Sequence, residues 1–413
     1  MKRYIILAAT LQKMGGAQNY LQSKLRWLRE QGWVADIIFY KEGPVMLPYL
    51  KDCHYCVEEL KHPTYYYNSR RREKICDKLL SIVCDNIYEQ TVIESTIVDL
   101  STWGEILASK LNAKHFIFSL QETDIISNHS MADYIRFKYE RRELAGITDA
   151  SVGRMLASFG MTIPEEKSYK LLAYMQDVLE DYEHPLTGKI REMTFDYTIG
   201  SIGRLEKPFV MPTINAIIDY VKADSKHQYL LLLIGDAAKG CENRKQIEEL
   251  CNTIPNITLL ITGYLYPIPV ELVRTCDVFF SSSGSAGVSV RCGVPTVSID
   301  GKDFKPIGVV GYTTNSRLFR TTEPVRPIAE YLNETLKDKK YPKASFHPMP
   351  QPDYTNHMQF IEQSNNIVEY YDISKLKWNK EQRLQRMLMP ILGPKVYHVL
   401  ISDSRNTIHR LLK

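Results

Sequence analysis

The sequence lacks any long apolar run, and this limits where the protein can be located. No segment approaches the roughly 18 consecutive apolar residues that a membrane-spanning helix needs. The apolar stretch near the N-terminus, Tyr4–Ala9, is shorter than the roughly 7–15 residues at the centre of a secretory signal, although the basic residues before it imitate one. We therefore expect a cytoplasmic protein, at most peripheral on the inner face of the membrane, and interpret Tyr4–Ala9 as a buried strand.

Metal-binding signatures are also scarce. The eight cysteines are scattered, and Cys53-His54-Tyr55-Cys56 is a CxxC motif without the second CxxC or histidine pair that would complete a zinc set. Reduced thiols in a reducing compartment are the simpler interpretation. The chain has no Asp-x-Asp motif, which could hold a divalent cation against a diphosphate. We expect no metal and no other cofactor.

An excess of charge of one sign is missing as well. The 52 Lys and Arg residues against 48 Asp and Glu residues give a formal net charge of +4 over 413 residues. A nucleic-acid-binding protein would usually concentrate a larger basic excess, so we expect no nucleic-acid partner. The apolar share of 44% and the charged share of 24% are typical of a folded globular protein. A chain of this length is expected to form two domains.

Short apolar runs alternate with helical patterns in the first half of the chain, which is typical of a parallel sheet covered on both faces. A further helix over Tyr169–Asp181, followed by His184–Gly188, marks a plausible end of a first domain at 1–190. The expected strands are Tyr4–Ala9, Val34–Tyr40, Thr91–Glu94 and His115–Leu120, and the expected helices are Ala17–Gln31, Arg70–Val83, Trp103–Leu111 and Met131–Leu144.

The same alternation restarts in a second domain, expected at 191–378, and several of its strands end in glycine. In an open parallel sheet the ligand lies beyond the carboxyl ends of the strands, where glycine allows close approach to the backbone. Helices are expected over 379–413, the last of them at 394–413. The expected strands are Tyr197–Ile202, Tyr229–Ile234, Ile257–Ile261, Val278–Phe280 and Thr296–Ile299, and the expected helices are Phe209–Val221, Cys241–Asn252, Val270–Thr275 and Val288–Cys292.

Three stretches are suited to bind phosphate. Gly15-Gly16 stands between a strand and a helix, where free backbone N–H groups attract an anion. Arg204 and Lys207 follow the first strand of the second domain, and an Arg fork beside a Lys point charge suits a diphosphate. Small residues from Ser281 to Ser289 crowd the start of a short helix and leave its N–H groups open to a ligand. The alternatives are a tight turn, an ion pair of Lys207 with Glu206, and a linker.

The order of these motifs resembles the GT-B glycosyltransferases, in particular the retaining family 4 (group 1) enzymes that build bacterial surface polysaccharides. The resemblance implies two Rossmann-like α/β/α domains that face a central cleft, with the acceptor held by the first domain, the nucleotide-sugar donor held by the second, and a last helix that crosses back onto the first. It is carried by Gly15-Gly16-Ala17, Gly203-Arg204-Leu205 with Lys207, Leu233-Ile234-Gly235-Asp236, Thr262-Gly263-Tyr264, Cys276-Asp277-Val278 and Cys292-Gly293-Val294-Pro295.

The resemblance implies that Arg204, Lys207 and Gly16 hold the donor diphosphate, and the glycines and small residues at the strand ends and the helix start add further candidates. The donor diphosphate would be bound by Gly15, Gly16, Arg204, Lys207, Ala286, Gly287 and Val288. The nucleotide would be bound by Gly203, Gly235, Gly263, Tyr264, Ser283, Gly284, Ser285 and Ser289.

This chain departs from the family at one position that concerns the donor. Family members carry a Glu-x7-Glu element whose second Glu grips the ribose, and the corresponding position here falls at about Val288, in a shortened segment without any carboxylate. Ribose contacts would then come from Ser285 or Ser289, or the donor would bind differently. Arg204 and Lys207 also stand closer together than in most members.

Two carboxylates are candidates to orient or deprotonate an acceptor hydroxyl. Glu122 follows a strand end, and Glu105 in Trp103-Gly104-Glu105 is expected to lie similarly, although most carboxylates at strand ends are solvated or cap a helix. His115 begins a strand, and we expect it to be structural.

Two clusters in the first domain mix cations with aromatic rings. Tyr65–Arg72 and Tyr134–Arg142 would suit an anionic membrane surface or a lipid-linked sugar, while a solvated helix face is the alternative for the second. The leading hypothesis is a metal-independent glycosyltransferase of the hexosyltransferase type that acts on a lipid-linked or oligosaccharide acceptor in the synthesis of capsule, exopolysaccharide or lipopolysaccharide O-antigen. The resemblance implies that the transfer retains the anomeric configuration. A non-catalytic glycosyltransferase-like subunit and a nucleotide-sugar epimerase on the same fold are the alternatives.

Overall fold

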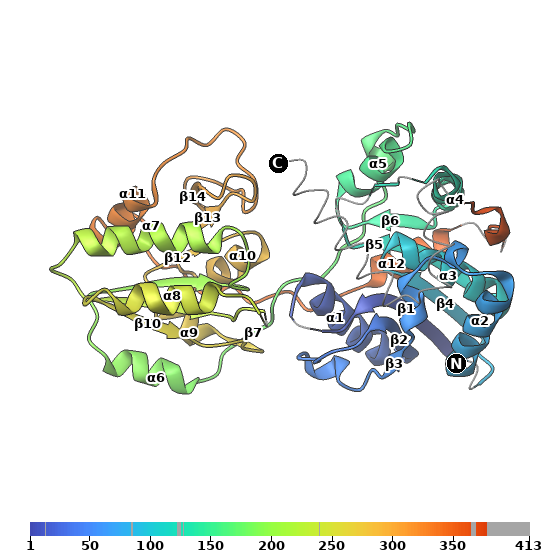
Figure 1. Cartoon of the computed structure of the whole chain (residues 1–413), viewed down its shortest axis with the longest axis horizontal. Coiled ribbons are helices and arrows are strands. Elements are labelled where there is room, and N and C mark those ends of the chain that lie inside the picture. The colour runs from blue at the N-terminus through green and yellow to red at the C-terminus, as the bar shows by residue number, and fades with distance from the viewer. Residues whose placement is uncertain are drawn as a thin grey trace, which may run out of the picture. The chain divides into compact units, whose positions relative to one another are not determined.

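The computed structural model describes residues 1–12, 14–83, 86–121, 125–126, 128–238, 240–364 and 369–377. The candidate Glu122 and the helices expected over 379–413 lie outside the described residues. The chain divides into two compact units (Figure 1). The first unit comprises Met1–Lys13, Tyr20–Tyr174 and Pro352–Lys413, and the second comprises Met14–Asn19 and Met175–Gln351.

A six-stranded parallel sheet forms the centre of the first unit, in the order β3-β2-β1-β4-β5-β6. The central strand β1 is buried on both faces from Tyr4 to Leu7, because helices cover both sides of the sheet. The strands are β1 (Lys2–Thr10), β2 (Trp33–Lys41), β3 (Tyr55–Cys56), β4 (Gln90–Ser95), β5 (Lys114–Ser119) and β6 (Leu144–Gly146).

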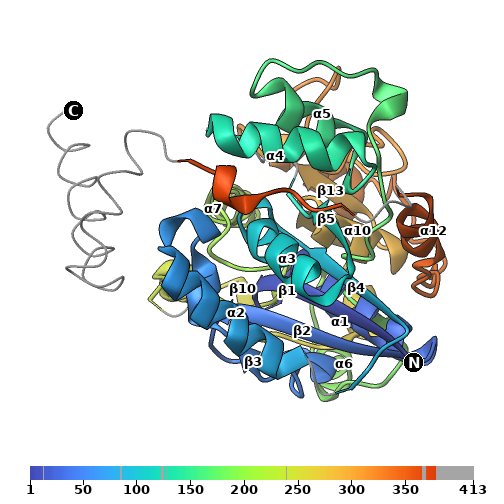
Figure 2. The same cartoon turned by 90° about the vertical axis from the view of Figure 1, so that its right-hand side faces the viewer.

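Helices α2 (Ser69–Val83) and α3 (Val98–Leu111) cover the sheet face to which Ile5 and Leu7 contribute, and Figure 2 looks onto that face. Helices α1 (Gly16–Glu30) and α12 (Thr355–Gln363) lie against the opposite face, where Lys24 of α1 stands over the ring of Tyr4. Two further helices, α4 (His129–Glu140) and α5 (Asp149–Ala157), pack near the β6 edge. The alternation of Tyr4 and Ile5 between faces thus follows the pleat of the strand.

The second unit repeats this topology with the strand order β10-β9-β8-β12-β13-β14, in which only the edge strand β14 is antiparallel. A short parallel pair of β7 (Leu179–Glu180) and β11 (Ile268–Pro269) lies beside it. The main strands are β8 (Tyr197–Ile202), β9 (Tyr229–Ile234), β10 (Ile257–Ile261), β12 (Val278–Ser281), β13 (Thr296–Ile299) and β14 (Pro306–Val309).

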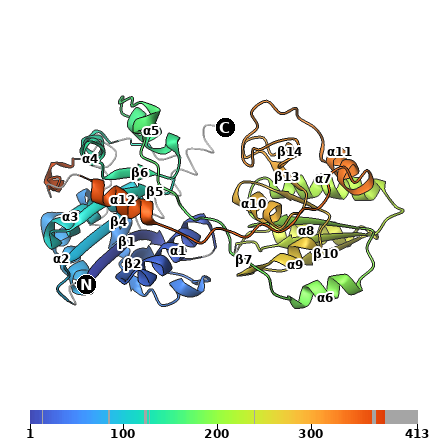
Figure 3. The same cartoon turned by 180° about the vertical axis from the view of Figure 1, so that it is seen from behind.

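Two layers of helices cover this second sheet, as Figure 3 shows from behind. Leu231 and Leu233 of β9 belong to one core with α7 (Val210–Ala223), α8 (Asn243–Asn252) and α11 (Ile328–Leu332). Leu230 and Leu232 belong to the other core, with α6 (Pro185–Glu192), α9 (Val270–Arg274) and α10 (Gly284–Arg291). Two parallel α/β sheets of Rossmann-like order, 3-2-1-4-5-6 in each unit, confirm the expected fold class.

Several local predictions were wrong. No helix forms over Tyr169–Asp181, because Lys170 pairs with Gly146 beside β6, and backbone hydrogen bonds to Gly146 hold Tyr169 and Leu171 extended. The helix expected over Met131–Leu144 ends at Glu140, since Leu144 begins β6. Strands β3, β6 and β14 and helix α5 were not predicted, because short or edge elements carry little periodic signal.

No helix among the described residues is long and apolar enough to cross a lipid bilayer.

Candidate functional site

Three glycines with positive φ follow three neighbouring strands of the second unit. Gly203, Gly235 and Gly263 come directly or nearly directly after β8, β9 and β10, with φ values of 135°, 145° and 72°. A Cβ on Gly235 would lie 2.0 Å from the carbonyl oxygen of Gly203, so two loops touch at the backbone and only glycine fits between them. Glycine was expected after three strands, and this is confirmed for Gly235 and Gly263, whereas Gly284, expected after β12, is the first residue of α10.

Gly203 also lies beside polar groups. A Cβ on this residue would lie 3.2 Å from Oγ of Ser285 and 3.6 Å from Nζ of Lys207, and Nζ of Lys207 itself donates a hydrogen bond to Oγ of Ser285 over 3.4 Å. Strand β8, before Gly203, and strand β12, before Ser285, are neighbours at the point where the strand order reverses. Ligands of open α/β sheets bind at this switch point, beyond the carboxyl ends of the strands.

The electrostatics of Lys207 are those of a cation kept partly out of water. Burial lowers the pKa of Lys207, and the guanidinium of Arg204 lowers it further, while Asp177 and Glu206 oppose the shift. Arg204 is 43% exposed, and its Nη1 lies 3.5 Å from Oε1 of Glu206. Glu206 is thus paired with Arg204, and two cations stand within one loop after β8. A bound polyanion would relieve the repulsion between them.

Asp177 is a site neighbour that sequence reasoning missed. It lies in the segment before β7, and burial raises its pKa, while the amide of Asn19 and the ammonium of Lys207 act in the opposite direction. Nδ2 of Asn19 donates a hydrogen bond to Oδ1 of Asp177 over 2.8 Å. Because the segment was expected to be helical, no sequence signal placed Asp177 beside Lys207.

A second polar group lies on the β9 and β10 side of the site. Nη1 of Arg244 lies 3.0 Å from both carboxylate oxygens of Asp236, which follows Gly235. Burial raises the pKa of Tyr264. The carboxylate of Glu206 raises it further and the guanidinium of Arg204 lowers it, so the phenol of Tyr264 lies near this pair of charges. Arg244 is in α8 and had no motif to signal it, whereas Tyr264 was a candidate for nucleotide binding.

Helix α10 begins earlier than predicted. It starts at Gly284, after Ser283, which has a positive φ of 58° with a ψ of −130°, and both residues are exposed. The first N–H groups of a helix have no partner within it, and here they belong to Gly284, Ser285 and Ala286. The N–H of Gly287 already bonds to the carbonyl of Ser283.

Two candidates on α10 are parts of the core. Val288 is 1% exposed and packs in the cluster that includes Leu230 and Phe279. Ser289 is fully buried, and its hydroxyl accepts a hydrogen bond from Thr296 and donates one to the carbonyl of Ala286. Both residues therefore face away from any ligand at the start of α10, whereas Ser285 faces Lys207.

Gly15 and Gly16 precede or begin α1. A Cβ on Gly16 would lie 3.3 Å from Cβ of Met175, so this glycine permits close packing against the chain that enters the second unit. Their contact with a donor diphosphate stays a prediction.

Glu105 does not follow a strand end, and this prediction was wrong. It lies within α3 and is fully buried, with Oε2 2.8 Å from Nζ of Lys138 and 2.7 Å from Nδ1 of His115. Burial alone would raise the pKa of Glu105, but Lys138 and His115 lower it to about 2. A carboxylate held in this way cannot reach a substrate. His115 is structural, as expected, since Nε2 also bonds to Oγ of Ser95.

The aromatic and basic cluster Tyr134–Arg142 is also largely internal. Nζ of Lys138 lies 2.6 Å from Oε2 of Glu143, Nε of Arg141 lies 3.2 Å from Oε1 of the same residue, and both cations are buried. These charges hold α4 against β5 and β6 and are not a surface for anionic lipid. Neither the membrane interpretation nor the solvated helix face describes them.

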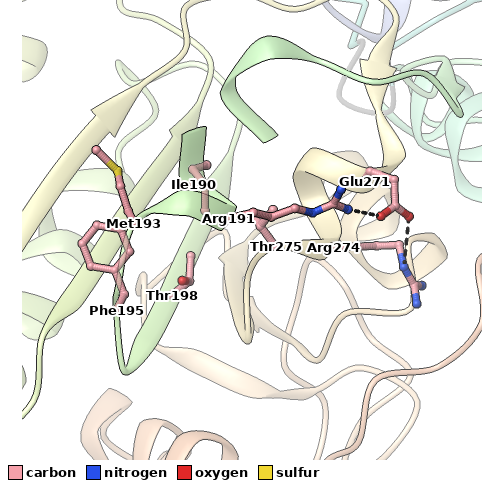
Figure 4. Close-up of a pocket in the computed structure, with 8 residues that line it drawn as sticks. All are labelled: Ile190, Arg191, Met193, Phe195, Thr198, Glu271, Arg274 and Thr275. Atoms are coloured by element: carbon pink, nitrogen blue, oxygen red, sulfur yellow. Dashed lines mark hydrogen bonds and ion pairs between the residues drawn. The ribbon is translucent and has the colours of Figure 1, made fainter. Parts of the chain in front are cut away.

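A separate hollow of about 270 Å³ lies near the amino ends of the strands of the second sheet, away from their carboxyl ends (Figure 4). It is bordered by Thr198 at the beginning of β8 and by Arg191 and Arg274, which flank Glu271. Nη2 of Arg191 lies 2.7 Å and Nε of Arg274 lies 3.6 Å from this carboxylate. Because its cations are paired and it lies at the amino ends of the strands, we do not assign the donor to it.

Within the described residues, no group of three or more His, Cys, Asp or Glu side chains is placed to hold a metal ion.

Comparison with known proteins identifies the architecture. No family model matches the sequence, and no curated protein matches it. Among solved structures, Anabaena Alr3699/HepE in complex with UDP and glucose matches 94% of this chain and 99% of its own at 16% identity, with a TM-score of 0.53. The chain has the GT-B glycosyltransferase fold.

Two further GT-B structures agree over nearly the whole chain. A glycosyltransferase from Rickettsia africae matches 100% of this chain and 98% of its own at 14% identity, with a TM-score of 0.55. Sucrose-phosphate synthase from Thermosynechococcus elongatus matches 95% of this chain and 100% of its own at 13% identity, with a TM-score of 0.51. At these identities the likeness shows the GT-B fold and leaves the reaction to be argued from the site.

Proposed function

We propose that the protein is a glycosyltransferase that moves a sugar from a nucleoside diphosphate sugar to an acceptor hydroxyl. The observation that carries the proposal is the pair of cations, Arg204 and Lys207, in the loop after β8, with Lys207 bonded to Ser285 in the first turn of α10. This arrangement stands at the switch point of the second sheet. The two cations, the start of α10 and the loop at Gly203, which lies beside both Lys207 and Ser285, are proposed to form an anion site.

Each group has a role in the departure of the nucleoside diphosphate. As the bond between sugar and diphosphate breaks, negative charge grows on the leaving phosphate oxygens. The guanidinium of Arg204 can bind two of these oxygens at once, and the ammonium of Lys207 adds a point charge from its partly buried position. The N–H groups at the start of α10 and the positive end of its dipole add further stabilisation. These groups would act without a metal ion.

The nucleotide is proposed to extend toward β9 and β10. Gly235 and Gly263 leave the backbone accessible there, and Tyr264 and Asp236 offer an aromatic ring and a carboxylate. Since Val288 is buried, a ribose contact would come from Ser285, Ser283 or Asp236 instead of from position 288. Retention of the anomeric configuration and a hexosyl donor are supported by the family resemblance. UDP-glucose is the first donor to test, because HepE, which has the same fold, was solved in complex with UDP and glucose.

The proposed acceptor is lipid-linked or an oligosaccharide, in the synthesis of a bacterial surface polysaccharide such as capsule, exopolysaccharide or lipopolysaccharide. The support is the family resemblance and the basic residues Arg70, Arg71 and Arg72 at the exposed start of α2 beside the tyrosines of 65–67. A cytoplasmic location, peripheral to the membrane, fits a reaction on a lipid-linked sugar.

A screen of nucleotide sugars tests the proposal. Ligands that bind the folded state raise the thermal midpoint in relation to their affinity and concentration. At least one nucleotide sugar and its nucleoside diphosphate should stabilise the protein, and product analysis by mass spectrometry should then show a glycosylated acceptor. Stabilisation without a product from any acceptor would favour a non-catalytic subunit, and conversion of the donor without acceptor would indicate an epimerase. No stabilisation by any nucleoside diphosphate at millimolar concentration would refute the proposal.

A further inference from the structure

Two arginine side chains of the second unit lie together on the outer face of α10. A Cβ on Gly287 would lie 2.6 Å from Nη1 of Arg317, so the guanidinium of Arg317 lies against the helix where glycine leaves room for it. Arg291 stands one turn further along α10, and residues four positions apart lie on the same face of a helix. The exposed Arg317 and the partly buried Arg291 therefore share one surface.

The loop that carries Arg317 is bonded to the elements on both sides of it. The carbonyl oxygen of Arg317 accepts a hydrogen bond from the N–H of Ser283, just before α10. The carbonyl oxygen of Leu318 accepts one from the N–H of Gly301 over 2.8 Å, beyond the end of β13. Because the backbone of this loop is already ordered, a ligand that binds the side chain pays no backbone entropy.

The charges of Arg291 and Arg317 lack a counter-charge. Within the part of the chain that the structure describes, neither guanidinium forms an ion pair, and Nη1 of Arg291 is buried without an acceptor. Burial lowers the pKa of Arg291 and the guanidinium of Arg317 lowers it further, while the thiol of Cys292 opposes the shift. Repulsion between like charges and a buried donor without an acceptor both cost free energy, and a bound anion removes both costs.

These two arginines differ in this respect from the rest of their unit. The other arginines of the second unit each form an ion pair with a carboxylate: Arg191, Arg204, Arg244, Arg274, Arg320 and Arg326. A shortage of carboxylates on this surface therefore distinguishes α10 and the loop beside it, and leaves two positive charges for an external anion.

The surface lies on the side of α10 away from the proposed donor site. Ser285, which bonds to Lys207, and Gly287 are two positions apart, which is about 200° around a helix. The sheet order agrees with this, because Lys207 follows β8 and Arg317 follows β14, and β8 and β14 lie on opposite sides of β12. An anion held by Arg291 and Arg317 is thus distinct from the donor diphosphate.

The charge of the two guanidiniums matches that of a phosphate group. Inorganic phosphate or a phosphate monoester carries about −1.5 to −2 charges at pH 7 and offers about three strong acceptor oxygens. A guanidinium fork binds two such oxygens at once, so two forks can share one phosphate. A carboxylate carries one charge on two oxygens, and it would compensate only half of the positive charge.

We infer that Arg291 and Arg317 form a second anion site, which binds a phosphate group other than the donor diphosphate. The phosphate belongs to inorganic phosphate or to a sugar phosphate, since both present the same terminal group. It bridges the two guanidiniums, because the exposed side chain of Arg317 can turn to admit it and Nη1 of Arg291 then gains an acceptor. The inference goes beyond the proposed function, since neither arginine belongs to the proposed donor site.

Calorimetric titration of the full chain in a phosphate-free buffer, at an ionic strength fixed with sodium chloride, tests the inference. The probes are inorganic phosphate, glucose 6-phosphate and, as a carboxylate, glucuronate. One of the two phosphates should bind, and glucuronate should bind about tenfold more weakly or not at all. Tighter binding of inorganic phosphate would identify the free ion as the ligand, and tighter binding of glucose 6-phosphate would identify a sugar phosphate; either result supports the site.

Three variants examine the two arginines and the glycine between them. Arg291→Gln and Arg317→Gln should each weaken phosphate binding by about tenfold or more, the usual loss for one charged hydrogen-bonding partner. Gly287→Ala removes no charge, but its Cβ would displace Nη1 of Arg317, the end of a flexible side chain. This variant should therefore fold and still bind phosphate more weakly.

Arg191→Gln is the matched control. It removes the same charge from the same unit, but Arg191 is exposed and already paired with Glu271, so phosphate binding should stay within about twofold. Arg317 is exposed, so Arg317→Gln should fold normally even if Arg291→Gln does not. Unchanged phosphate affinity in Arg317→Gln, no binding of either phosphate, or tighter binding of glucuronate than of both phosphates would overturn the inference.

UDP separates this inference from the proposed function. Saturating UDP fills the proposed donor site, and phosphate affinity should then stay within about twofold, as it should in Lys207→Ala without UDP. Arg317→Gln should bind UDP as the wild type does. Mutual exclusion of UDP and phosphate would assign the arginines to the donor site and overturn the second anion site. Phosphate binding that needs Arg317, without binding of any nucleoside diphosphate, would support the second anion site and refute the donor site.

Discussion

The ammonium of Lys207 donates a hydrogen bond to the hydroxyl of Ser285 over 3.4 Å, although the two residues are 78 positions apart. The bond joins the loop after β8 to the first turn of α10 across the switch point of the second sheet. A Cβ on Gly203 would lie 3.2 Å from Oγ of Ser285, and the φ of 135° at this position is one that residues with a side chain rarely adopt, so glycine is favoured beside this bond. A cation, a helix start and an accessible backbone thus meet at one place, and the proposed function depends on it.

Gly235→Ala should disrupt this arrangement. The added Cβ would lie 2.0 Å from the carbonyl oxygen of Gly203, a backbone atom, at a φ of 145°. We expect a loss of about 2 kcal/mol or more in the free energy of unfolding, from strain and overpacking together. Differential scanning calorimetry would show a lower midpoint for the second unit.

Gly188→Ala is the matched control in the same unit. Gly188 lies inside α6, and a Cβ there would meet no atom within 4 Å. Alanine in a helix interior should stabilise by up to about 1 kcal/mol. A midpoint for Gly235→Ala as high as that for Gly188→Ala would contradict the packing of the two loops.

Val288→Glu should not restore a family-like ribose contact. Val288 is buried among Leu230 and Phe279, so a carboxylate placed there loses its water without gaining a partner. We expect a loss of about 3 kcal/mol or more in stability and no gain in UDP affinity. Val290→Glu, on the partly exposed side of α10, should be tolerated. Equal midpoints for both variants, or tighter UDP binding by Val288→Glu, would show that position 288 faces the ligand.

Acid should destabilise the first unit through His115 and Glu105. Burial lowers the pKa of His115 to about 4, and Lys138 adds to the shift. Between pH 6.5 and 4 the unfolded chain therefore binds a proton that the folded chain does not, and the free energy of unfolding decreases as the pH falls, by up to about 1.4 kcal/mol per pH unit. The pKa of Glu105, about 2 against an ordinary 4.5, gives a further loss as the pH falls from 4.5 to 2.

Tryptophan fluorescence isolates this effect, because the second unit, Met14–Asn19 and Met175–Gln351, contains no tryptophan. Urea unfolding followed by tryptophan fluorescence should give a smaller free energy of unfolding at pH 4.5 than at pH 7. In the His115→Gln variant the free energy of unfolding should decrease less steeply between pH 6.5 and 4, because the titrating imidazole is gone. The same slope in both proteins would contradict the buried, neutral state of His115.

Much of the fold could be predicted from the sequence, because buried parallel strands are continuous apolar runs. Tyr4–Ala9 and Tyr229–Ile234 were found in this way, and the glycines after β8, β9 and β10 marked the ligand edge. The segment Tyr169–Asp181 has a helical pattern, yet pairing of Lys170 with Gly146 overrides it. Local sequence carries no record of such a long-range pairing, and Asp177 was missed for this reason.

Site candidates next to a strand end could be predicted from the sequence, whereas candidates whose placement depends on long-range packing could not. Arg204 and Lys207 follow a strand end, which the sequence shows, and the structure places them together. Glu105 was misplaced because a helix begins at Val98, after the short turn that follows β4, and a buried ion pair was not visible in the spacing of its residues. Val288 is a candidate because the sequence predicts a helix that begins there, and Ser289 because it could replace the absent ribose-binding Glu. The helix α10 begins at Gly284 instead, and both side chains lie in the core.

Calorimetric titration with UDP tests the central claim most directly. Wild-type protein should bind UDP or another nucleoside diphosphate, and Arg204→Ala and Lys207→Ala should each weaken that binding by about tenfold or more, the usual loss for one charged hydrogen-bonding partner. Binding of uridine should change little, since it lacks the diphosphate. Arg191→Ala, which removes an exposed arginine paired with Glu271 in the hollow of Figure 4, should bind UDP as the wild type does. Unchanged UDP affinity in both Arg204→Ala and Lys207→Ala would contradict the account.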